Sequence, residues 1–164
     1  MRWLAVLSPL LFTAPAAPAA QPAHYERPVP GAVVRPFDDV GQYEAGHRGV
    51  DLATVPDEPV RTAAAGEVTF AGQVAGRGVV VVLHADGLRT TYEPVEPLVR
   101  MDQRLSAGAV LGRVTGAHEG CSPGRCLHWG VRRGELYLDP MTLLANLAPV
   151  RLLPWDGWPP GRNT

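Results

Sequence analysis

The sequence predicts a single all-β domain, an antiparallel β-sheet or β-sandwich built from many short strands. The chain of 164 residues contains 18 Gly and 17 Pro, which divide its apolar segments into runs of strand length. No long segment before Met141 has the 3.6-residue spacing of apolar side chains that an amphipathic helix requires. Val, Leu and Ala are nevertheless plentiful enough to build a globular core.

Strand signals follow one another along the chain between turn residues. The dipeptide Asp86-Gly87 lies between two of these segments and predicts a β-hairpin. After Met141 the pattern favours one or two helical turns, up to Leu147. The predicted strands cover residues 60–62, 66–71, 78–84, 88–92, 104–105, 109–114 and 127–132.

The two ends of the chain differ from its middle. Arg2 precedes an apolar stretch and small residues follow around Ala16 to Ala20, which is the pattern of a secretory signal peptide. No other stretch is long and apolar enough to span a bilayer, and no cysteine stands at the cleavage region for a lipid anchor. We therefore expect a soluble, exported (extracytoplasmic) protein divided into a signal peptide (1–20), an irregular entry segment (21–46), a β domain (47–145) and a Pro- and Trp-containing tail (146–164).

Two segments about 80 residues apart carry the chemistry of a metal site. If residues 47–51 (HRGVD) are extended, His47 and Asp51 share one face, because side chains alternate along a strand. In 126–131 (CLHWGV), Cys126 and His128 share a polar face opposite an apolar stripe. His47, Asp51 and His128 would supply the three ligands of a zinc site. Without a family resemblance they are more often a surface histidine, a turn or capping carboxylate and a packed ring, because a lone His-x-x-x-Asp recurs by chance.

Several motifs in the same order resemble the lysostaphin/LytM-type zinc endopeptidases, from about Pro28 to Leu144. The resemblance implies a LytM-type β domain, zinc as cofactor with His47, Asp51 and His128 as its ligands, and peptidoglycan peptides as the substrate class. The motifs are HRGVDLA at 47–53, PVRTAAAGEV at 59–68, LRTTY at 88–92, LHWGVR at 127–132 and LDP at 138–140.

The family's two helper histidines are both replaced. Their positions read Cys126 and Pro94 in this sequence. A bound zinc polarises a carbonyl and lowers the pKa of its water toward about 7, but a positioned acid or base is worth roughly 10²–10⁴-fold, and loss of a stabilising donor costs a comparable factor. Glu93 would replace the base only if a bulge or turn at Glu93-Pro94 redirected its side chain, since in a regular strand it faces away from position 94. The catalytic residues therefore stay unassigned.

Cys121 and Cys126 are the two cysteines of the chain, and the residues between them favour a turn. In an exported protein we expect them to form a disulfide. Such a short loop gains little closure entropy, so the bridge would mainly fix the shape of the rim of the groove. The alternative is a second zinc site made by His118, Cys121, Cys126 and His128.

Residues 65–68 and 107–112 form a weak internal repeat. Its spacing of Gly and hydrophobic residues resembles the barrel-sandwich hybrid motif of lipoyl and biotinyl carrier domains. Those carriers attach their cofactor to a lysine, and all 15 basic residues of this chain are Arg. The chemistry therefore excludes a carrier role while the architecture stays open.

Three functions fit these features. The first is a catalytically impaired zinc-binding domain that binds peptidoglycan peptides or regulates a cell-wall hydrolase. The second is an active zinc endopeptidase with a substitute base, and the third is a structural module of the cell envelope. The complete set of ligands speaks against the third, and the absence of both histidines favours the first over the second. The net charge of −1 provides no basic field, so we expect no nucleic-acid partner.

Overall fold

The computed structural model describes residues 23–41, 44–116, 121 and 124–144. The predicted all-β class is confirmed, because these residues form two antiparallel sheets and one short helix, α1 (Met141–Leu144). The large sheet has the strand order β1-β2-β10-β6-β5-β4-β8, with β11 paired to β10, and the small sheet has the order β3-β9-β7. The strands are β1 (Val33–Arg35), β2 (Val50–Thr54), β3 (Pro59–Arg61), β4 (Gly66–Val74), β5 (Arg77–His84), β6 (Leu88–Glu93), β7 (Val95–Pro97), β8 (Arg104–Leu105), β9 (Val110–Val114), β10 (Arg125–Arg133) and β11 (Leu136–Leu138).

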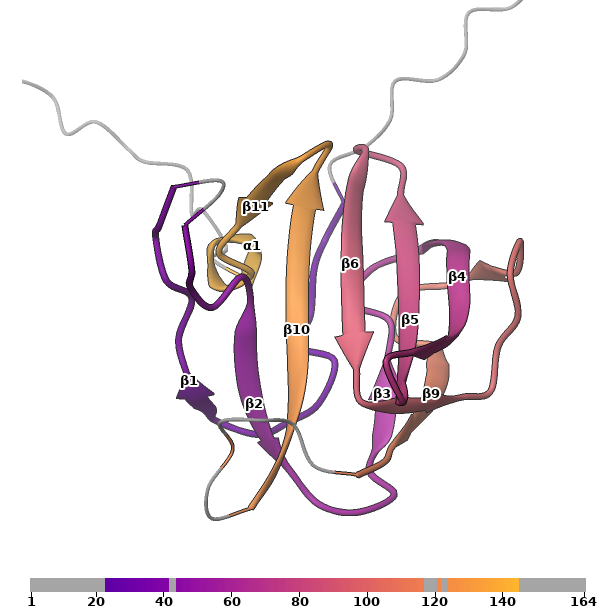
Figure 1. Cartoon of the computed structure of the whole chain (residues 1–164). Helices are drawn as coiled ribbons and strands as arrows, with labels where there is room; N and C mark the ends of the chain where they lie inside the picture. Colours follow the sequence, from indigo (N-terminus) through magenta and orange to yellow (C-terminus); the bar gives the residue numbers. More distant parts are fainter. Residues whose placement is uncertain (1–22, 42–43, 117–120, 122–123, 145–164) are drawn as a thin grey trace, which may run out of the picture.

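The small sheet lies behind the large one in Figure 1, and the two share a single core. Val60 from β3 and Leu111 from β9 are buried there with Tyr92 from β6 and Trp129 from β10. All four are fully covered from solvent. The large sheet therefore has one face committed to the core, and its other face, which we call the outer face, is available for a site.

Strand β10 shows how the sequence assigns these two faces. Leu127, Trp129 and Val131 are buried in the core, as the predicted apolar stripe requires. Cys126 and His128 alternate with them and therefore lie on the outer face. The antiparallel pairing of β10 with β2 and β6 repeats this division across the middle of the sheet.

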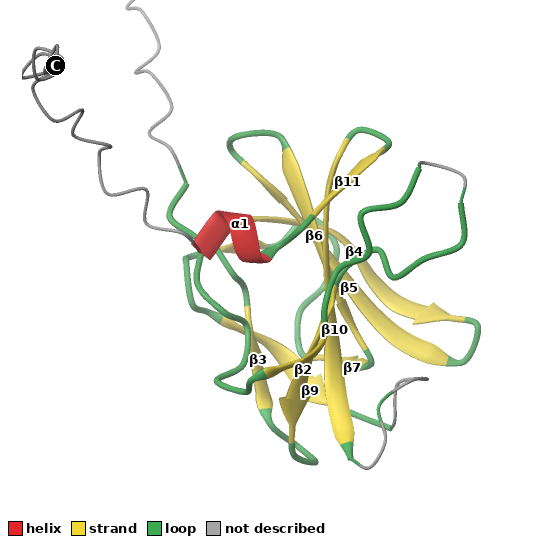
Figure 2. Cartoon of the chain, turned by 90° about the vertical axis from the view of Figure 1, so that its left-hand side faces the viewer, coloured by secondary structure: helices red, strands yellow, loops and turns green. Residues whose placement is uncertain are grey.

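The observed strands agree with the predicted segments in order and differ mainly at their ends. β5 and β6 pair as the predicted hairpin, and Gly87 in their turn has φ 82°. Strands β1, β7 and β11, of three residues each, were not predicted, although strands as short as β3 and β8 were. β1 lies in the entry segment expected to be irregular, and β2 pairs with it along one edge of the large sheet (Figure 1). Figure 2 shows the strands in yellow and the short helix α1 in red. The predicted signal peptide and most of the predicted tail region lie outside the described residues. Among the residues that the structure does describe, no helix is long and apolar enough to cross a membrane.

His84 closes a buried polar network at the end of β5. Its Nδ1 donates to the carbonyl of Ala65 at 2.9 Å, because a carbonyl only accepts, and its Nε2 lies 2.8 Å from the hydroxyl of Thr90. That hydroxyl is 2.9 Å from the hydroxyl of Tyr92, which accepts from the backbone N–H of Ala63 at 2.9 Å. The network joins β5 and β6 to the segment before β4. His84 is thus a structural residue, as its position at the end of a strand suggested.

Burial lowers the pKa of His84, and its hydrogen bond to Ala65 and the nearby Asp86 carboxylate oppose that shift only in part. Folded His84 therefore binds fewer protons than in the unfolded chain, where its pKa is about 6.5. Stability should be complete above that pH and fall as the pH is lowered through it, toward the depressed pKa of the folded state. Urea unfolding from about pH 7.5 to about pH 5.5, in EDTA to exclude metal, measures this slope.

The comparison that isolates His84 uses two variants. His84→Asn should lower stability near neutral pH but flatten the acid slope, because the titrating group is gone. His24→Asn removes a histidine whose side chain is 71% exposed and should leave the slope as it was. Equal slopes for the native chain and His84→Asn would show that acid sensitivity has another origin.

Candidate metal centre

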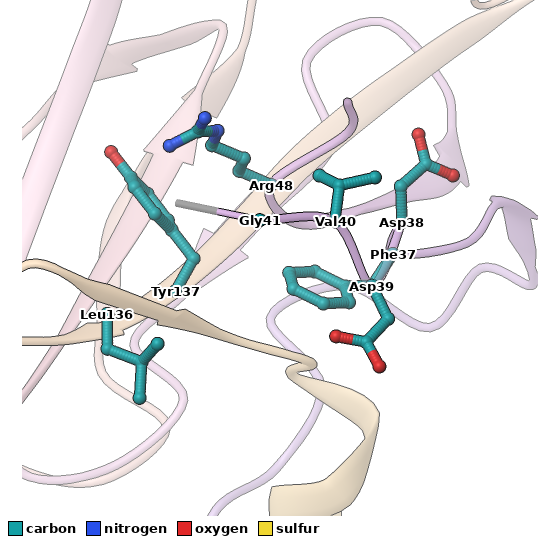
Figure 3. A pocket seen from close by; sticks show the side chains of 8 residues that line it. All are labelled: Phe37, Asp38, Asp39, Val40, Gly41, Arg48, Leu136 and Tyr137. Atoms are coloured by element: carbon teal, nitrogen blue, oxygen red, sulfur yellow. The ribbon is translucent and has the colours of Figure 1, made fainter. Parts of the chain in front are cut away.

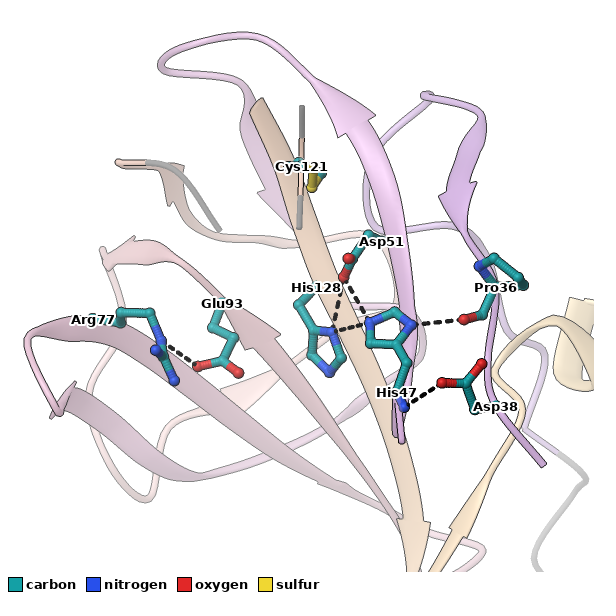
Figure 4. Close-up of polar contacts among 9 residues, drawn as sticks. Pro36, Asp38, His47, Asp51, Arg77, Glu93, Cys121 and His128 are labelled. Carbon is teal, nitrogen blue, oxygen red and sulfur yellow. Dashed lines mark hydrogen bonds and ion pairs between the residues drawn. A yellow bond between two sulfur atoms is a disulfide. The ribbon is translucent and has the colours of Figure 1, made fainter. Parts of the chain in front are cut away.

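Three side chains from two strand regions converge on the outer face of the large sheet. His47 precedes β2, Asp51 belongs to β2, and His128 lies directly opposite Asp51 on β10. His47 Nε2 and His128 Nδ1 are each 2.9 Å from Asp51 Oδ1 and 3.0 Å from one another. The structure therefore brings together the three residues that the sequence proposed as ligands, as Figure 4 shows.

The entry segment holds His47 in place. His47 Nδ1 lies 2.7 Å from the carbonyl of Pro36 and donates to it. The backbone N–H of His47 donates to Asp38 Oδ2 at 2.7 Å, and the backbone N–H of Asp38 returns a bond to the His47 carbonyl at 2.9 Å. These contacts fix both the tautomer and the direction of the imidazole, which is what the partners around metal-binding histidines do.

Gly49 makes room for the ring of His128. A Cβ at this position would lie 2.7 Å from His128 Nε2 and 2.6 Å from the carbonyl oxygen of Trp129. Both distances are too short for a real side chain. The glycine between His47 and Asp51 is therefore a requirement of the close approach between β2 and β10.

The donor set fits zinc. Since His47 donates through Nδ1, its neutral ring presents a lone pair at Nε2, toward the Asp51 carboxylate and the second imidazole. The three nitrogen and oxygen atoms are close enough to one another for a single cation to bridge them. A tetrahedral zinc with bonds of about 2.0–2.1 Å holds its ligand atoms about 3.3 Å apart, within a few tenths of an ångström of this arrangement. Two imidazoles and a carboxylate are also a ligand set that zinc commonly takes.

The two positions of the replaced helper histidines carry no group for proton transfer. Cys126 is fully buried and forms a disulfide with Cys121, so its sulfur cannot act as a thiolate. Pro94 is buried and its ring has neither a donor nor an acceptor. His118, a histidine that the sequence left as an alternative helper or ligand, lies outside the described residues.

Glu93 corrects an expectation. In a regular strand its side chain was expected to point away from the site, but β6 ends at Glu93 and pairs it directly opposite His128. Directly opposed residues of antiparallel strands share a face, so Glu93 belongs to the outer face. Its carboxylate is 3.4 Å from Nε of Arg77 on β5, and Figure 4 shows Glu93 between Arg77 and His128.

A small hollow of about 70 Å³ lies beside the segment that holds His47 (Figure 3). The side chain of Arg48 contributes to its wall, with its guanidinium 5.1 Å from the ring centre of Tyr137 and a 2.8 Å hydrogen bond to the carbonyl of Glu44. These contacts tie the loop before β2 to β11. They stabilise the backbone that carries the first ligand.

The supporting roles of Pro36 and Asp38 were missed by sequence reasoning. Pro36 acts through its backbone carbonyl, which every residue possesses, so the sequence holds no signal for it. Asp38 stands nine residues before the histidine that it holds, and no local motif has that spacing. Only the folded path of the entry segment reveals them.

The comparisons with known proteins agree with this fold. Residues 45–140 match the model of Peptidase family M23. An uncharacterised protein of Mycobacterium tuberculosis is 46% identical over 148 residues, which cover 82% of this chain and 59% of that protein. DD-carboxypeptidase/endopeptidase Mpg of Neisseria meningitidis is 32% identical over 98 residues, or 59% of this chain and 22% of Mpg. The solution structure of lysostaphin superposes with a TM-score of 0.60 at 21% identity, covering 74% of this chain and 54% of lysostaphin.

The fold and the His-Asp-His cluster define a metallopeptidase-like β domain. The chain belongs to peptidase family M23, which confirms the resemblance to the lysostaphin/LytM-type proteins. It spans only about 59% of the length of its mycobacterial relative.

His128→Ala tests the proposed ligand set. Loss of a surrounding partner alone costs about 10–100-fold in metal affinity, so loss of a ligand should weaken zinc binding by more than about 100-fold. Competition with a chromophoric chelator measures the affinity, and circular dichroism in EDTA should show that the β fold persists. Retained zinc affinity would remove His128 from the ligand set.

Asp38→Ala tests the support of His47 in the same assay. It leaves all three ligands intact but frees the backbone of His47, so zinc affinity should fall by about 10-fold, at the lower end of the range for such partners. Asp39→Ala provides the control, because it removes the adjacent carboxylate, for which the structure gives no contact to His47. An equal effect of the two variants would indicate a general loss of negative charge.

Proposed function

We propose that this chain is an extracytoplasmic zinc-binding domain that binds peptidoglycan peptides and hydrolyses them weakly or not at all. The observation that carries the proposal is a complete set of ligands next to two positions that cannot transfer a proton. His47, Asp51 and His128 meet within 3.0 Å. Beside them Cys126 is bridged and the side chain of Pro94 has no polar atom.

The size of the rate contributions that this site lacks favours binding over catalysis. When bound, zinc supplies Lewis-acid polarisation of a carbonyl and activation of water. Proton transfer by a positioned side chain contributes a further 10²–10⁴-fold or so, and stabilisation of the developing oxyanion contributes roughly 10²–10³-fold. A site without both keeps its affinity for peptide carbonyls and loses most of its rate.

The location and the substrate class rest on separate supports. A disulfide is typical of oxidising compartments outside the cytoplasm, in agreement with the predicted signal peptide. Mpg is named as a DD-carboxypeptidase/endopeptidase. By likeness to it, we infer that the ligand of this chain is a peptide of the bacterial wall. A cell-wall hydrolase that the domain regulates is the alternative partner.

One observation favours a second candidate function, an active endopeptidase with Glu93 as its base. Glu93 lies on the outer face directly across from His128, on the strand that leads to the lost histidine. Its side chain is 18% exposed, and its ion pair with Arg77 draws the carboxylate toward β5. To act as the base, the carboxylate would have to leave Arg77 and take a proton at the metal centre.

A peptidoglycan assay with the zinc-loaded chain distinguishes these functions. We expect one zinc per chain by elemental analysis, binding to insoluble peptidoglycan, and little release of soluble peptides. His47→Ala should abolish zinc binding and reduce retention on the wall. The same assay also tests Glu93→Gln against Glu96→Gln, which removes an exposed carboxylate on β7.

Each outcome decides between the candidates. Release that depends on His47 and falls about 10²–10⁴-fold in Glu93→Gln but not in Glu96→Gln would establish the active enzyme. Zinc binding with wall retention but no release supports the binding domain. Absence of both zinc and wall binding would leave only a structural module.

A further inference from the structure

We propose that Arg89 and Arg132, which lie along the outer face from the metal centre, form a carboxylate-binding subsite for an extended peptide. This inference rests on the proposed function, since it specifies which peptide the groove takes. The ligand is a peptide whose free terminal carboxylate reaches the two arginines while its other end lies at the metal centre. Small apolar residues would precede that carboxylate.

The register of the sheet places the two arginines together. Arg132 on β10 lies directly opposite Arg89 on β6, so their Cβ atoms are about 4.5–5.5 Å apart on one face. Both side chains are half-buried and line the same hollow of about 480 Å³. Two guanidinium groups at this separation match the two oxygens of a single carboxylate.

The arginine pair is not neutralised by its surroundings. Within the described part of the chain neither arginine forms an ion pair or side-chain hydrogen bond, although Arg77 on the same face is paired with Glu93. Like charges directly opposite one another in a sheet are destabilising. An anion between them would remove this repulsion, which gives the subsite its preference for a carboxylate over a neutral end.

The remainder of the hollow is apolar. Val79 and Val81 from β5 form its floor, and Phe70 and Val74 from β4 stand beside them. Phe70 is 36% exposed and Val74, the last residue of β4, is 46% exposed, so apolar surface is open to solvent along this strand. Methyl-sized side chains next to the carboxylate would cover it.

The spacing sets the length of the peptide. His128 and Arg132 are four residues apart on β10, which corresponds to about 13 Å along a strand. Gly130 and Thr91 lie opposite one another between them, so the floor of this path carries no large side chain. A peptide in extended conformation would place about four residues between the metal centre and its carboxylate.

The test compares two N-dansyl peptides of sequence Gly-Gly-D-Ala-D-Ala, one with a free terminal carboxylate and one with a carboxamide. The dansyl group is uncharged, so the carboxylate is the only anion that differs. With the zinc-loaded full chain, the acid should bind at least about 10-fold more tightly than the amide in low salt, because charge-assisted hydrogen bonds are the stronger class. Dansyl fluorescence measures both dissociation constants.

Two variants assign this preference. The double variant Arg89→Gln/Arg132→Gln should reduce the preference for the acid over the amide to less than about 2-fold, because the charge-assisted hydrogen bonds are lost. Arg133→Gln removes the same charge one residue along, on the opposite side of β10, and should keep the preference. The double variant should also melt at a higher temperature than the native chain, because the repulsion is gone, which excludes misfolding as the cause.

The failures are distinguishable. Equal binding of acid and amide by a chain that binds peptidoglycan would overturn the subsite and leave the proposed function standing. Persistence of the preference in the double variant would overturn the assignment to these arginines. Failure of the native chain to bind either peptidoglycan or zinc would remove the proposed function itself, and zinc affinity in the double variant shows that the metal centre is unaffected.

Discussion

The site depends on the register in which β2 pairs with β10. That pairing sets Asp51 opposite His128 and Leu52 opposite Leu127, so a single arrangement buries the apolar pair in the core and places the polar pair on the outer face. A slip by one residue would turn every side chain of one strand to the other face. The core therefore enforces the geometry of the metal centre, because Leu52 and Leu127 leave the core if the ligands separate.

Many of the strands and the polar face of β10 could be predicted from the sequence, because the pattern of buried and exposed side chains is local. Alternation along β10 is strong, since Leu127 and Trp129 must be buried while His128 must not, and it predicted both the strand and its polar face. The hairpin at Asp86-Gly87 was equally clear, because few residues accept a positive φ at the turn. Motif resemblance then supplied the pairing of distant segments that periodicity alone could not provide.

What escaped sequence reasoning depended on how the chain leaves its regular elements. Glu93 was assigned to the wrong face because alternation was continued from position 94, which lies beyond the end of β6. Asp38 and Pro36 were missed because they act across a loop, Asp38 through its carboxylate on the backbone of His47 and Pro36 through its own carbonyl. The arginine pair at Arg89 and Arg132 needs the register of two strands separated by more than 40 residues in sequence, which no local pattern records.

The replacement at Cys126 has two consequences that belong together. A sulfur in a disulfide cannot transfer protons, yet the bridge to Cys121 fixes the chain that enters β10 immediately before His128. The cysteines are five residues apart, so closure entropy contributes little and the effect is local. In the function that we propose, this position is not needed for proton transfer and serves instead to hold the chain beside the metal centre. Such rigidity would favour recognition of one extended peptide, since an ordered site loses less conformational entropy when its ligand binds.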